Sequence, residues 1–194
     1  MFALILAVAV MLMGAGYAYW TDSVTFSNTV KTGQVELAYD TANAGSIEVG
    51  PNFNNNAVAT GSVSYSEDKK IATVALNNLF PGAIGEVTLV VKNLSTIPVK
   101  IKEIKLNSIS ISNLSKDNFT IGAKVYYGNE LIKTFDNILA LEAIPTIDEV
   151  VPANTDVIVK LTYSMPKDVT TGENGSIKFN VTPTFTQFNE VNEE

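Results

Sequence analysis

The chain opens with a continuous apolar run. Residues 2–20 carry no charged side chain, and about 20 consecutive apolar residues suffice to cross a bilayer as a helix. The pattern therefore predicts a helix that meets a membrane at some stage. We interpret residues 1–18 as a signal peptide, because the small residues Gly16 and Ala18 precede the predicted cut with the spacing that a signal peptidase accepts.

Other interpretations of this segment stay open. The basic residues that usually begin a signal peptide are missing, since the first basic residue is Lys31. Either the natural chain starts a few residues upstream, or the segment is handled differently. It could be retained as a membrane anchor, or form a core helix of the kind that bundles inside type IV pilin filaments.

Apolar and polar residues alternate directly after the predicted cut. We name residues 19–32 the N-terminal ribbon. A period of two is typical of a β-strand with one buried face. The ribbon begins at Tyr19, and its apolar face carries Trp20, Val24, Phe26 and Val30. Periodicity alone also fits the first strand of the chain's own domain.

Residues 33–186 continue as short alternating runs between turn residues, with many Val, Ile, Thr and Tyr side chains. This pattern predicts an all-β domain, a jelly-roll-like antiparallel β-sandwich that follows the N-terminal hydrophobic segment. Residues 187–194 lose the alternation and form an acidic tail that we expect to be mobile.

Local signals place several turns. Residues 80–82 (Phe-Pro-Gly) predict a type II turn that reverses the chain. Hairpins are predicted around Gly128 and at the Asn174-Gly175 pair. The Asn-rich residues 52–56 predict an exposed loop.

Two further signals concern strand continuity and helix. The apolar parity flips at Glu103 and returns at Ile109, which requires a bulge or a change of sheet. Residues 136–144 are the one helix candidate of this region, with Asp136 as N-cap and Pro145 ending the helix.

Composition narrows the chemistry. Thirteen basic residues, all lysine, stand against twenty acidic ones, and the net charge of −7 argues against binding nucleic acid. The chain has no Cys, His or Arg, which removes the nucleophile, zinc and imidazole constellations of most enzymes. We therefore expect no enzyme and no cofactor. A hydrolase with paired carboxylates stays formally open, although the pairs Glu67-Asp68 and Asp148-Glu149 are predicted to be surface residues.

The sequence also contains candidate modification positions and one acidic loop. A loop at residues 168–174 lacks the ligand spacing of a calcium site. Five Asn-x-Ser/Thr sites offer candidate glycosylation positions in an exported protein, at Asn93, Asn113, Asn118, Asn174 and Asn180.

Several strings resemble one known family. Residues 16–23 read GYAYWTDS, followed by Phe26, Thr32-Gly33 and residues 35–37 (VEL). This succession resembles the TasA/camelysin family of secreted biofilm-matrix fibre proteins. Residues 78–82 (NLFPG) and the string VKNLSTIPV, which ends at Val99, look like that family's turn and hairpin. Residues 103–194 match only as a strand-rich sandwich.

The resemblance implies an extracellular structural subunit, similar also to archaeal bundling pilins. Such a subunit is processed by a signal peptidase, contacts the membrane only during export, and polymerises head-to-tail with identical subunits. By position, the donor strand would be the N-terminal ribbon, with Tyr19 at its start and Trp20, Val24, Phe26 and Val30 as inserted side chains. The family's metalloprotease activity is not carried over, because the chain has no His. A membrane-anchored surface binding module is the alternative function.

Overall fold

The computed structural model describes residues 2–18, 33–42, 47–50, 52–53, 56–57, 59–170 and 173–189. The chain divides into two compact units, Met1–Thr32 and Gly33–Glu194. In the first unit the described residues form one helix, α1 (Phe2–Ala18). Within the described residues, no helix combines the length and hydropathy of a membrane span.

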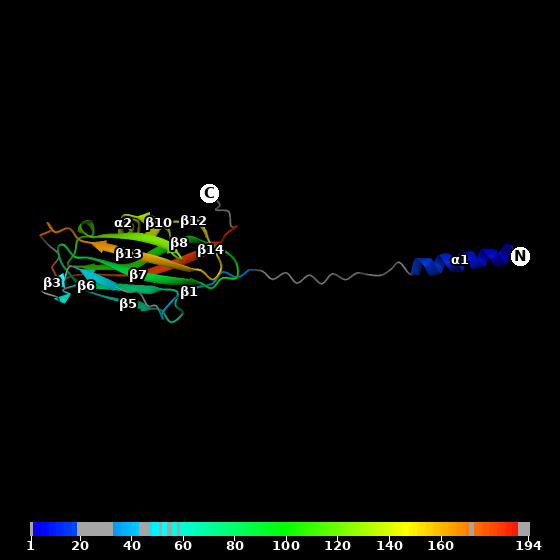
Figure 1. Cartoon of the computed structure of the whole chain (residues 1–194), viewed down its shortest axis with the longest axis horizontal. Helices are drawn as coiled ribbons and strands as arrows, with labels where there is room; N and C mark the ends of the chain where they lie inside the picture. Colours follow the sequence, from blue (N-terminus) through cyan, green and yellow to red (C-terminus); the bar gives the residue numbers. More distant parts are fainter. Residues whose placement is uncertain are drawn as a thin grey trace. The chain divides into compact units, whose positions relative to one another are not determined.

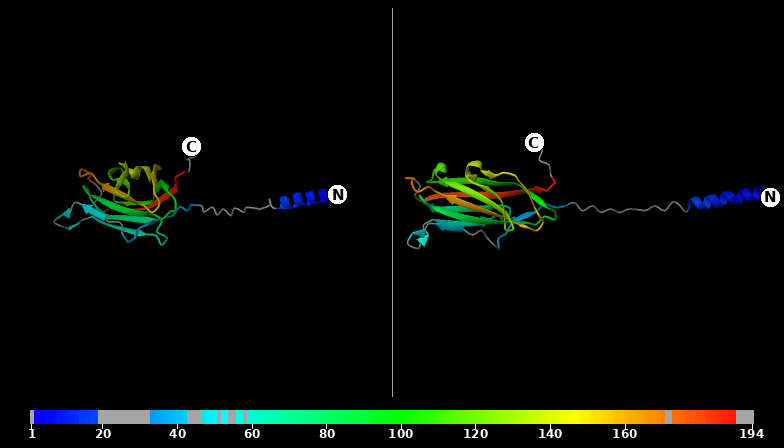
Figure 2. Two further views of the ribbon diagram at one scale, coloured as in Figure 1. Left: turned by 45° about the vertical axis from the view of Figure 1, so that its right-hand side comes forward. Right: turned by 45° about the horizontal axis from the view of Figure 1, so that its top comes forward.

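The second unit is built almost entirely of strands (Figures 1 and 2). Its strands are β1 (Leu37–Tyr39), β2 (Ile47–Gly50), β3 (Asn52–Phe53), β4 (Asn56–Ala57), β5 (Thr60–Tyr65), β6 (Ala72–Leu79), β7 (Ile84–Asn93), β8 (Val99–Ser112), β9 (Thr120–Tyr127), β10 (Glu130–Phe135), β11 (Ala143–Ile144), β12 (Ile147–Val151), β13 (Asp156–Ser164) and β14 (Gly175–Gln187). Two short helical turns interrupt them, η1 (Lys116–Asn118) and α2 (Ile138–Leu141).

The strands form two antiparallel sheets that pack as a sandwich. The first sheet has the order β1-β7-β13-β9-β10, and β2 also pairs with β7. The second has the order β11-β8-β14-β6-β5, and β12 also pairs with β8. This strand order is that of a jelly roll with additional edge strands. The predicted all-β sandwich is confirmed.

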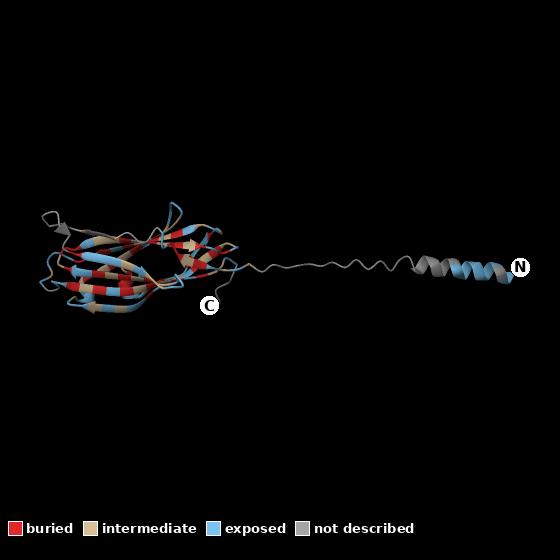
Figure 3. Ribbon diagram, turned by 90° about the horizontal axis from the view of Figure 1, so that it is seen from below, coloured by how far each residue is buried: buried red, intermediate tan, exposed pale blue. Residues whose placement is uncertain are grey.

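The core lies between the sheets, because every long strand turns alternate side chains inward. Buried and exposed residues alternate along the strands (Figure 3). Val87, Leu89 and Val91 on β7 lie beside Val157 and its inward neighbours on the adjacent strand β13, and all of them are buried on the core side of the first sheet. Fully burying such a side chain is worth roughly 1.5–3 kcal/mol, so the alternation read from the sequence is also the main source of stability.

Two of the predicted reversals join the sheets instead of forming hairpins. The turn at residues 80–82 has the predicted geometry, since the Ala83 amide donates to the Phe80 carbonyl at 2.9 Å and Gly82 has a φ of 88°. It nevertheless leads from β6 in one sheet to β7 in the other. The predicted Asn174-Gly175 hairpin is wrong, because β13 and β14 belong to different sheets.

Of the other turn, loop and tail predictions, one is confirmed and the rest need correction. The hairpin around Gly128 is confirmed by the pairing of β9 with β10. The hairpin implied for the string ending at Val99 is wrong, because β7 and β8 lie in different sheets. Residues 52–56 are predicted as a loop, but they include β3 and the first residue of β4, which pair as a two-stranded sheet. The expected acidic tail starts later than predicted, since β14 extends through Gln187, and residues 190–194 lie outside the described part.

The parity flip on β8 is confirmed as a bulge. The β14 partners shift between Thr184 and Phe185, which leaves an extra residue on β8 beside Glu103. A second shift lies where β14 steps from Lys178 to Asn180, and Ser108 there has a φ of 54°. One strand can therefore keep apolar residues inward although their sequence parity changes twice.

The predicted helix after β10 exists but is shorter. Asn137, and not Asp136, is the N-cap, since its side chain accepts from the Leu139 amide at 3.1 Å. The helix ends at a left-handed Glu142 before Pro145 is reached. Ala143 and Ile144 follow directly and pair with β8 as strand β11. Their backbone groups therefore form sheet hydrogen bonds and do not continue the helix.

Candidate functional site

The sequence directs attention to the N-terminal ribbon and to the place where it joins the domain. The predicted donor-strand residues Tyr19, Trp20, Val24, Phe26 and Val30 lie outside the described residues. The predicted cleavage residues Gly16 and Ala18 lie in the last turn of α1, which ends at Ala18.

The chain enters the sandwich along residues 33–36, which we call the ribbon base. These residues run beside the loop between β7 and β8. The Leu94 amide donates to the Glu36 carbonyl at 2.9 Å, and the Thr96 amide donates to the Gln34 carbonyl at 3.1 Å. The base is therefore held by main-chain pairing just beyond the end of β7.

Two hydroxyl groups complete this pairing. Buried Ser95 accepts from the Glu36 amide at 2.9 Å and donates to the Glu36 carbonyl at 3.1 Å through the same Oγ. Thr96 Oγ1 accepts from the Gln34 amide at 3.0 Å. Each net hydrogen bond contributes about 1 kcal/mol, and an unpartnered buried group costs more. The base is thus fixed in position at one end of the sandwich.

Asn93 supports the loop from inside. It is 1% exposed, its Nδ2 donates to the Pro152 carbonyl at 2.9 Å, and its Oδ1 accepts from the Ser95 amide at 3.0 Å. A glycan would attach to this enclosed nitrogen. Glycosylation of Asn93 stays a prediction, and it would require this nitrogen to leave its hydrogen bond with Pro152.

The other four sites differ in access. Asn113 and Asn174 are exposed, whereas Asn118 and Asn180 are half-buried. The Asn180 side chain also accepts from Thr73 Oγ1 at 2.9 Å in the middle of the second sheet. Glycosylation of these four asparagines stays a prediction, and the two exposed ones are the most accessible.

Gly33 packs tightly in the ribbon base. A Cβ atom on Gly33 would lie 2.3 Å from Cγ2 of Ile97, well inside van der Waals contact. The absence of a side chain lets the base lie flat against the loop that follows β7. The Thr32-Gly33 pair quoted for the family resemblance therefore has a local structural reason at its second residue.

Strand β1 continues the base into the core. Tyr39 donates its hydroxyl to the Val181 carbonyl at 3.0 Å, and burial raises the pKa of Tyr39, with a smaller contribution from Tyr65. The next residue, buried Asp40, forms an ion pair with Lys92 at 3.1 Å. These contacts attach β1 to β7 in its own sheet and to β14 in the opposite one.

Catalytic chemistry finds little support among the described residues. Glu67, Asp68, Asp148 and Glu149 are all exposed, as predicted. The Asp68 carboxylate accepts from Ser66 Oγ and from the Lys70 amide, which lower the pKa of Asp68 and make it a turn-stabilising group. No group of three or more acidic side chains suited to a metal ion occurs in the described part of the chain.

A hollow of about 500 Å³ lies over the start of β7, lined by residues that include Ile84, Glu86 and Ser164. The Glu86 carboxylate is neutralised by Lys160 Nζ at 2.9 Å, and the described lining residues include no second carboxylate. The hollow therefore lacks the pair of acids that glycoside hydrolysis needs.

Sequence reasoning predicted a role for the N-terminal ribbon, which lies outside the described residues, and missed the polar residues that hold the ribbon base. Asn93 has the same parity as Val87, Leu89 and Val91, so the alternation on β7 contained the signal that this asparagine faces inward. Comparison of the chain with protein-family models finds no matching family, and comparison with curated proteins finds no match.

Proposed function

We propose that this protein is a structural subunit of an extracellular fibre or pilus, of the kind that forms a biofilm matrix. The N-terminal ribbon of one subunit would pair with the sheet of the next, and repetition of this contact would build a head-to-tail filament. Exchange of one strand is a heterologous contact, which produces an open filament whenever its rotation does not close a ring.

The fixed ribbon base is the observation that carries the proposal. Residues 33–36 are clamped at one end of the sandwich by the bonds of Ser95 and Thr96. The buried hydrophobic residues described in the structure all lie between Leu37 and Phe185. The described residues after the base thus form a core between the two sheets, and we propose that the ribbon pairs with another molecule.

The energetics are compatible with such an exchange. Burying Trp20, Val24, Phe26 and Val30 would contribute on the order of 6–12 kcal/mol. Association and ordering cost roughly 4–15 kcal/mol. Because these terms nearly balance, main-chain pairing with an open sheet edge must contribute the remainder.

Removal of the ribbon tests the proposal directly. Deleting residues 19–29 from the mature chain should leave a folded, monomeric domain, because the described core begins at Leu37. Negative-stain electron microscopy should find filaments for the intact mature protein and none for the truncated one. Filaments from the truncated chain would rule out the ribbon as the polymerising element.

Two single substitutions separate the faces of the ribbon. Phe26→Ser removes a large apolar side chain from the predicted inserted face and should lower the extent of polymerisation at least tenfold, since about 1.5–3 kcal/mol of burial is lost per contact. Thr25→Ser lies on the opposite face and is the matched control, which should polymerise like the parent. Sedimentation of the polymer measures both.

N-terminal sequencing of the exported protein addresses the anchored alternative. Tyr19 as the first residue is expected for the fibre subunit. Retention of Met1 would favour the membrane-anchored binding module instead.

A further inference from the structure

The two ends of the sandwich are not equivalent. The ribbon base lies next to the loop between β7 and β8, so it shares one pole with Val99, where β8 begins. The 14 residues of β8 then run to Ser112, a distance of roughly 45 Å at the usual rise per residue. The end of β8 therefore lies at the pole opposite to the ribbon base.

One edge of β8 is covered over only half its length. On one side β14 pairs with β8 from Val99 to Ser112. On the other side β12 and β11 pair with it as far as Lys105, and the Leu106 amide then donates to the Glu142 carbonyl at 2.8 Å. Among the described residues, no backbone group pairs with the outer edge of residues 107–112, which we name the open edge.

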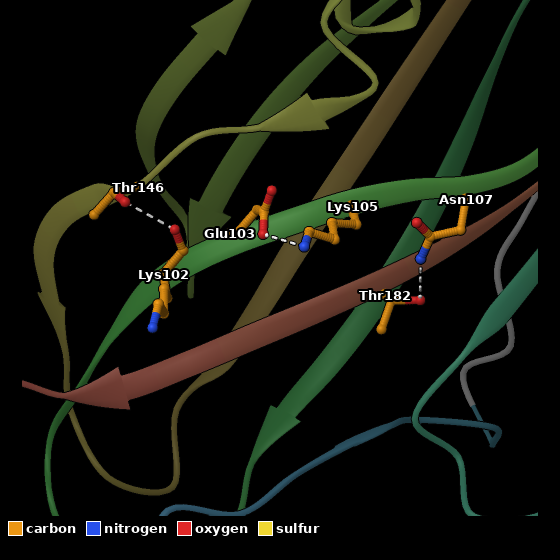
Figure 4. A network of polar contacts seen from close by, with 6 residues as sticks. All are labelled: Lys102, Glu103, Lys105, Asn107, Thr146 and Thr182. Atoms are coloured by element: carbon orange, nitrogen blue, oxygen red, sulfur yellow. Dashed lines mark hydrogen bonds and ion pairs between the residues drawn. The ribbon is translucent and has the colours of Figure 1, made fainter.

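Figure 4 shows where the coverage ends. Thr146 Oγ1 donates to the Lys102 carbonyl at 2.9 Å from the segment that joins β11 to β12. Further along β8, Asn107 Nδ2 reaches Thr182 Oγ1 at 3.3 Å on the β14 side. Before the open edge, β8 is contacted by a polar side chain from the β12 side. At the open edge, the side-chain contact of β8 is with β14 instead.

The sequence explains why the open edge lacks a partner. The chain before β11 forms the single turn α2, capped by Asn137 and the left-handed Glu142, and a helix cannot pair with a strand edge. Instead, α2 packs against β9 and β11 and buries Ile138 and Leu139. It closes this corner of the core without satisfying the edge.

The open edge has the amphipathic pattern of a receiving strand. Asn107, Ser108, Ser110 and Ser112 are exposed, while Ile109 and Ile111 are half-buried and pack against the core. An added strand would therefore need apolar residues on one face and small polar residues on the other. A similar pattern occurs in the N-terminal ribbon. Its even face carries Trp20, Val24, Phe26 and Val30, interrupted by Asp22 and Asn28, and Ser or Thr stands at positions 21, 23, 25, 27 and 29.

We propose that the open edge of β8 receives the N-terminal ribbon of a second copy of this chain. This proposal rests on the proposed function and names its acceptor. The apolar face of the ribbon would extend the hydrophobic layer of Ile109 and Ile111, and its hydroxyl face would lie beside Ser110. Because the ribbon base and the open edge occupy opposite poles, each contact adds a subunit along the long axis of the sandwich.

Two other sheet edges, those of β10 and β5, fit less well. Strand β10 carries Glu130 and Lys133 along its edge, and charges are a common protection of edge strands against pairing. Strand β5 lies under β2, where a Cβ on Gly61 would meet Ile47 at 2.6 Å. An incoming strand would find little free apolar surface there.

Disulfide trapping tests the acceptor. The chain has no cysteine, so only introduced residues can react. Neighbouring antiparallel strands bring paired Cα atoms to about 4.5–5.5 Å, within the range for a disulfide. Ser110→Cys should be combined in turn with Ser23→Cys, Thr25→Cys and Ser27→Cys, because these residues share the outward face and their spacing covers the alternative registers.

The experiment uses mature protein in which filaments have been observed by microscopy. At least one of the three pairs should convert monomer into a ladder of covalent oligomers on oxidation, and a reductant should reverse the change. Matched controls place the acceptor cysteine on the other edges, as Ser62→Cys on β5 and Thr134→Cys on β10. They should leave the protein monomeric on a denaturing gel.

The outcomes separate the two proposals. Filaments without a ladder from any Ser110 pair, or a ladder from Ser62→Cys or Thr134→Cys only, would overturn the assignment of the open edge and leave the fibre function standing. A cross-linked monomer from a Ser110 pair would mean that the ribbon pairs with its own domain, which overturns the exchange. Failure of the parent chain to form filaments would reject the proposed function itself.

Discussion

Tyr39 connects the first sheet to the second sheet, close to the ribbon base. It lies on β1, and its hydroxyl donates to the Val181 carbonyl on β14 across the core. Its ring also lies 5.2 Å from that of Tyr65. Burial raises the pKa of Tyr39 because the phenolate would lose its hydration inside the sandwich.

Replacement of this hydroxyl should change both the stability and its pH dependence. Because the folded-state pKa is raised, the stabilisation is fully present below the unfolded pKa of about 10 and is lost as the pH rises above it. Tyr39→Phe should lower the free energy of unfolding by about 1–2 kcal/mol at neutral pH and make its alkaline decline shallower. Urea unfolding at pH values of about 7 and 10.5 measures both effects.

Tyr163→Phe is the matched control for that experiment. Among the residues that the structure describes, the buried Tyr163 hydroxyl has no hydrogen-bond partner, so its removal should cost little at neutral pH. Equal losses of stability at neutral pH in both variants would contradict the role assigned to the bond between Tyr39 and Val181.

Some properties of individual residues were readable in the sequence, and others were not. The inward parity of Val87, Leu89 and Val91 followed from alternation alone, and it placed Asn93 on the same face. The Asn-x-Ser pattern instead suggested an accessible side chain. A three-residue motif carries no information on burial, because the partners Pro152 and Glu36 are brought to the loop only by the fold.

The long strand β8 accommodates two changes of side-chain parity within one element. Its bulges let Ile104 and Leu106 point inward although they break the parity of Val99 and Ile101. At the second bulge, Ser108 adopts a φ of 54°. The left-handed region costs a residue with a Cβ roughly 1–2 kcal/mol.

Glycine should therefore stabilise the bulge. Ser108→Gly removes the steric cost and should raise the free energy of unfolding by about 0.5–1 kcal/mol after the loss of backbone entropy is deducted. Ser110→Gly, two residues further in the same strand, should instead lower the free energy of unfolding by a similar amount. Chemical denaturation of the two variants should give changes of opposite sign, and a loss of stability in Ser108→Gly would contradict this account of the bulge.

Element types were more predictable than their partners. Strand positions, the bulge at Glu103 and the turn geometry at Gly82 followed from periodicity and local chemistry. The sheet to which each strand belongs did not, because a turn reverses the chain equally well within a sheet or between two sheets. The Asn174-Gly175 pair looks like a hairpin turn in sequence, yet β13 and β14 are separated by the core.

At the scale of the whole molecule, charge opposes assembly. The chain has a net charge of −7 and a calculated isoelectric point near 4.6, so identical subunits repel each other at neutral pH. The ribbon contributes only Asp22 and Lys31 to this charge. The proposed contact between subunits is therefore driven by apolar and main-chain interactions against a general electrostatic repulsion.

Salt should accordingly accelerate polymerisation. Raising the ionic strength from about 0.01 M to 0.15 M shortens the screening length from about 30 Å to 8 Å, and the initial rate measured by light scattering should increase several-fold. The chain lacking residues 19–29 is the control and should scatter equally at both salt concentrations. Slower assembly of the intact chain in salt would indicate an interface held by ion pairs.

The position of β14 determines when the second sheet can form during synthesis of the chain. It is the last strand in the described part of the chain, yet it lies between β8 and β6 in the middle of its sheet. Neither half of that sheet can be joined until residues 175–187 have been synthesised. If the proposed function holds, a prematurely terminated chain would carry the N-terminal ribbon but lack a completed sheet to receive the ribbon of a neighbour, so it would end a filament without extending it.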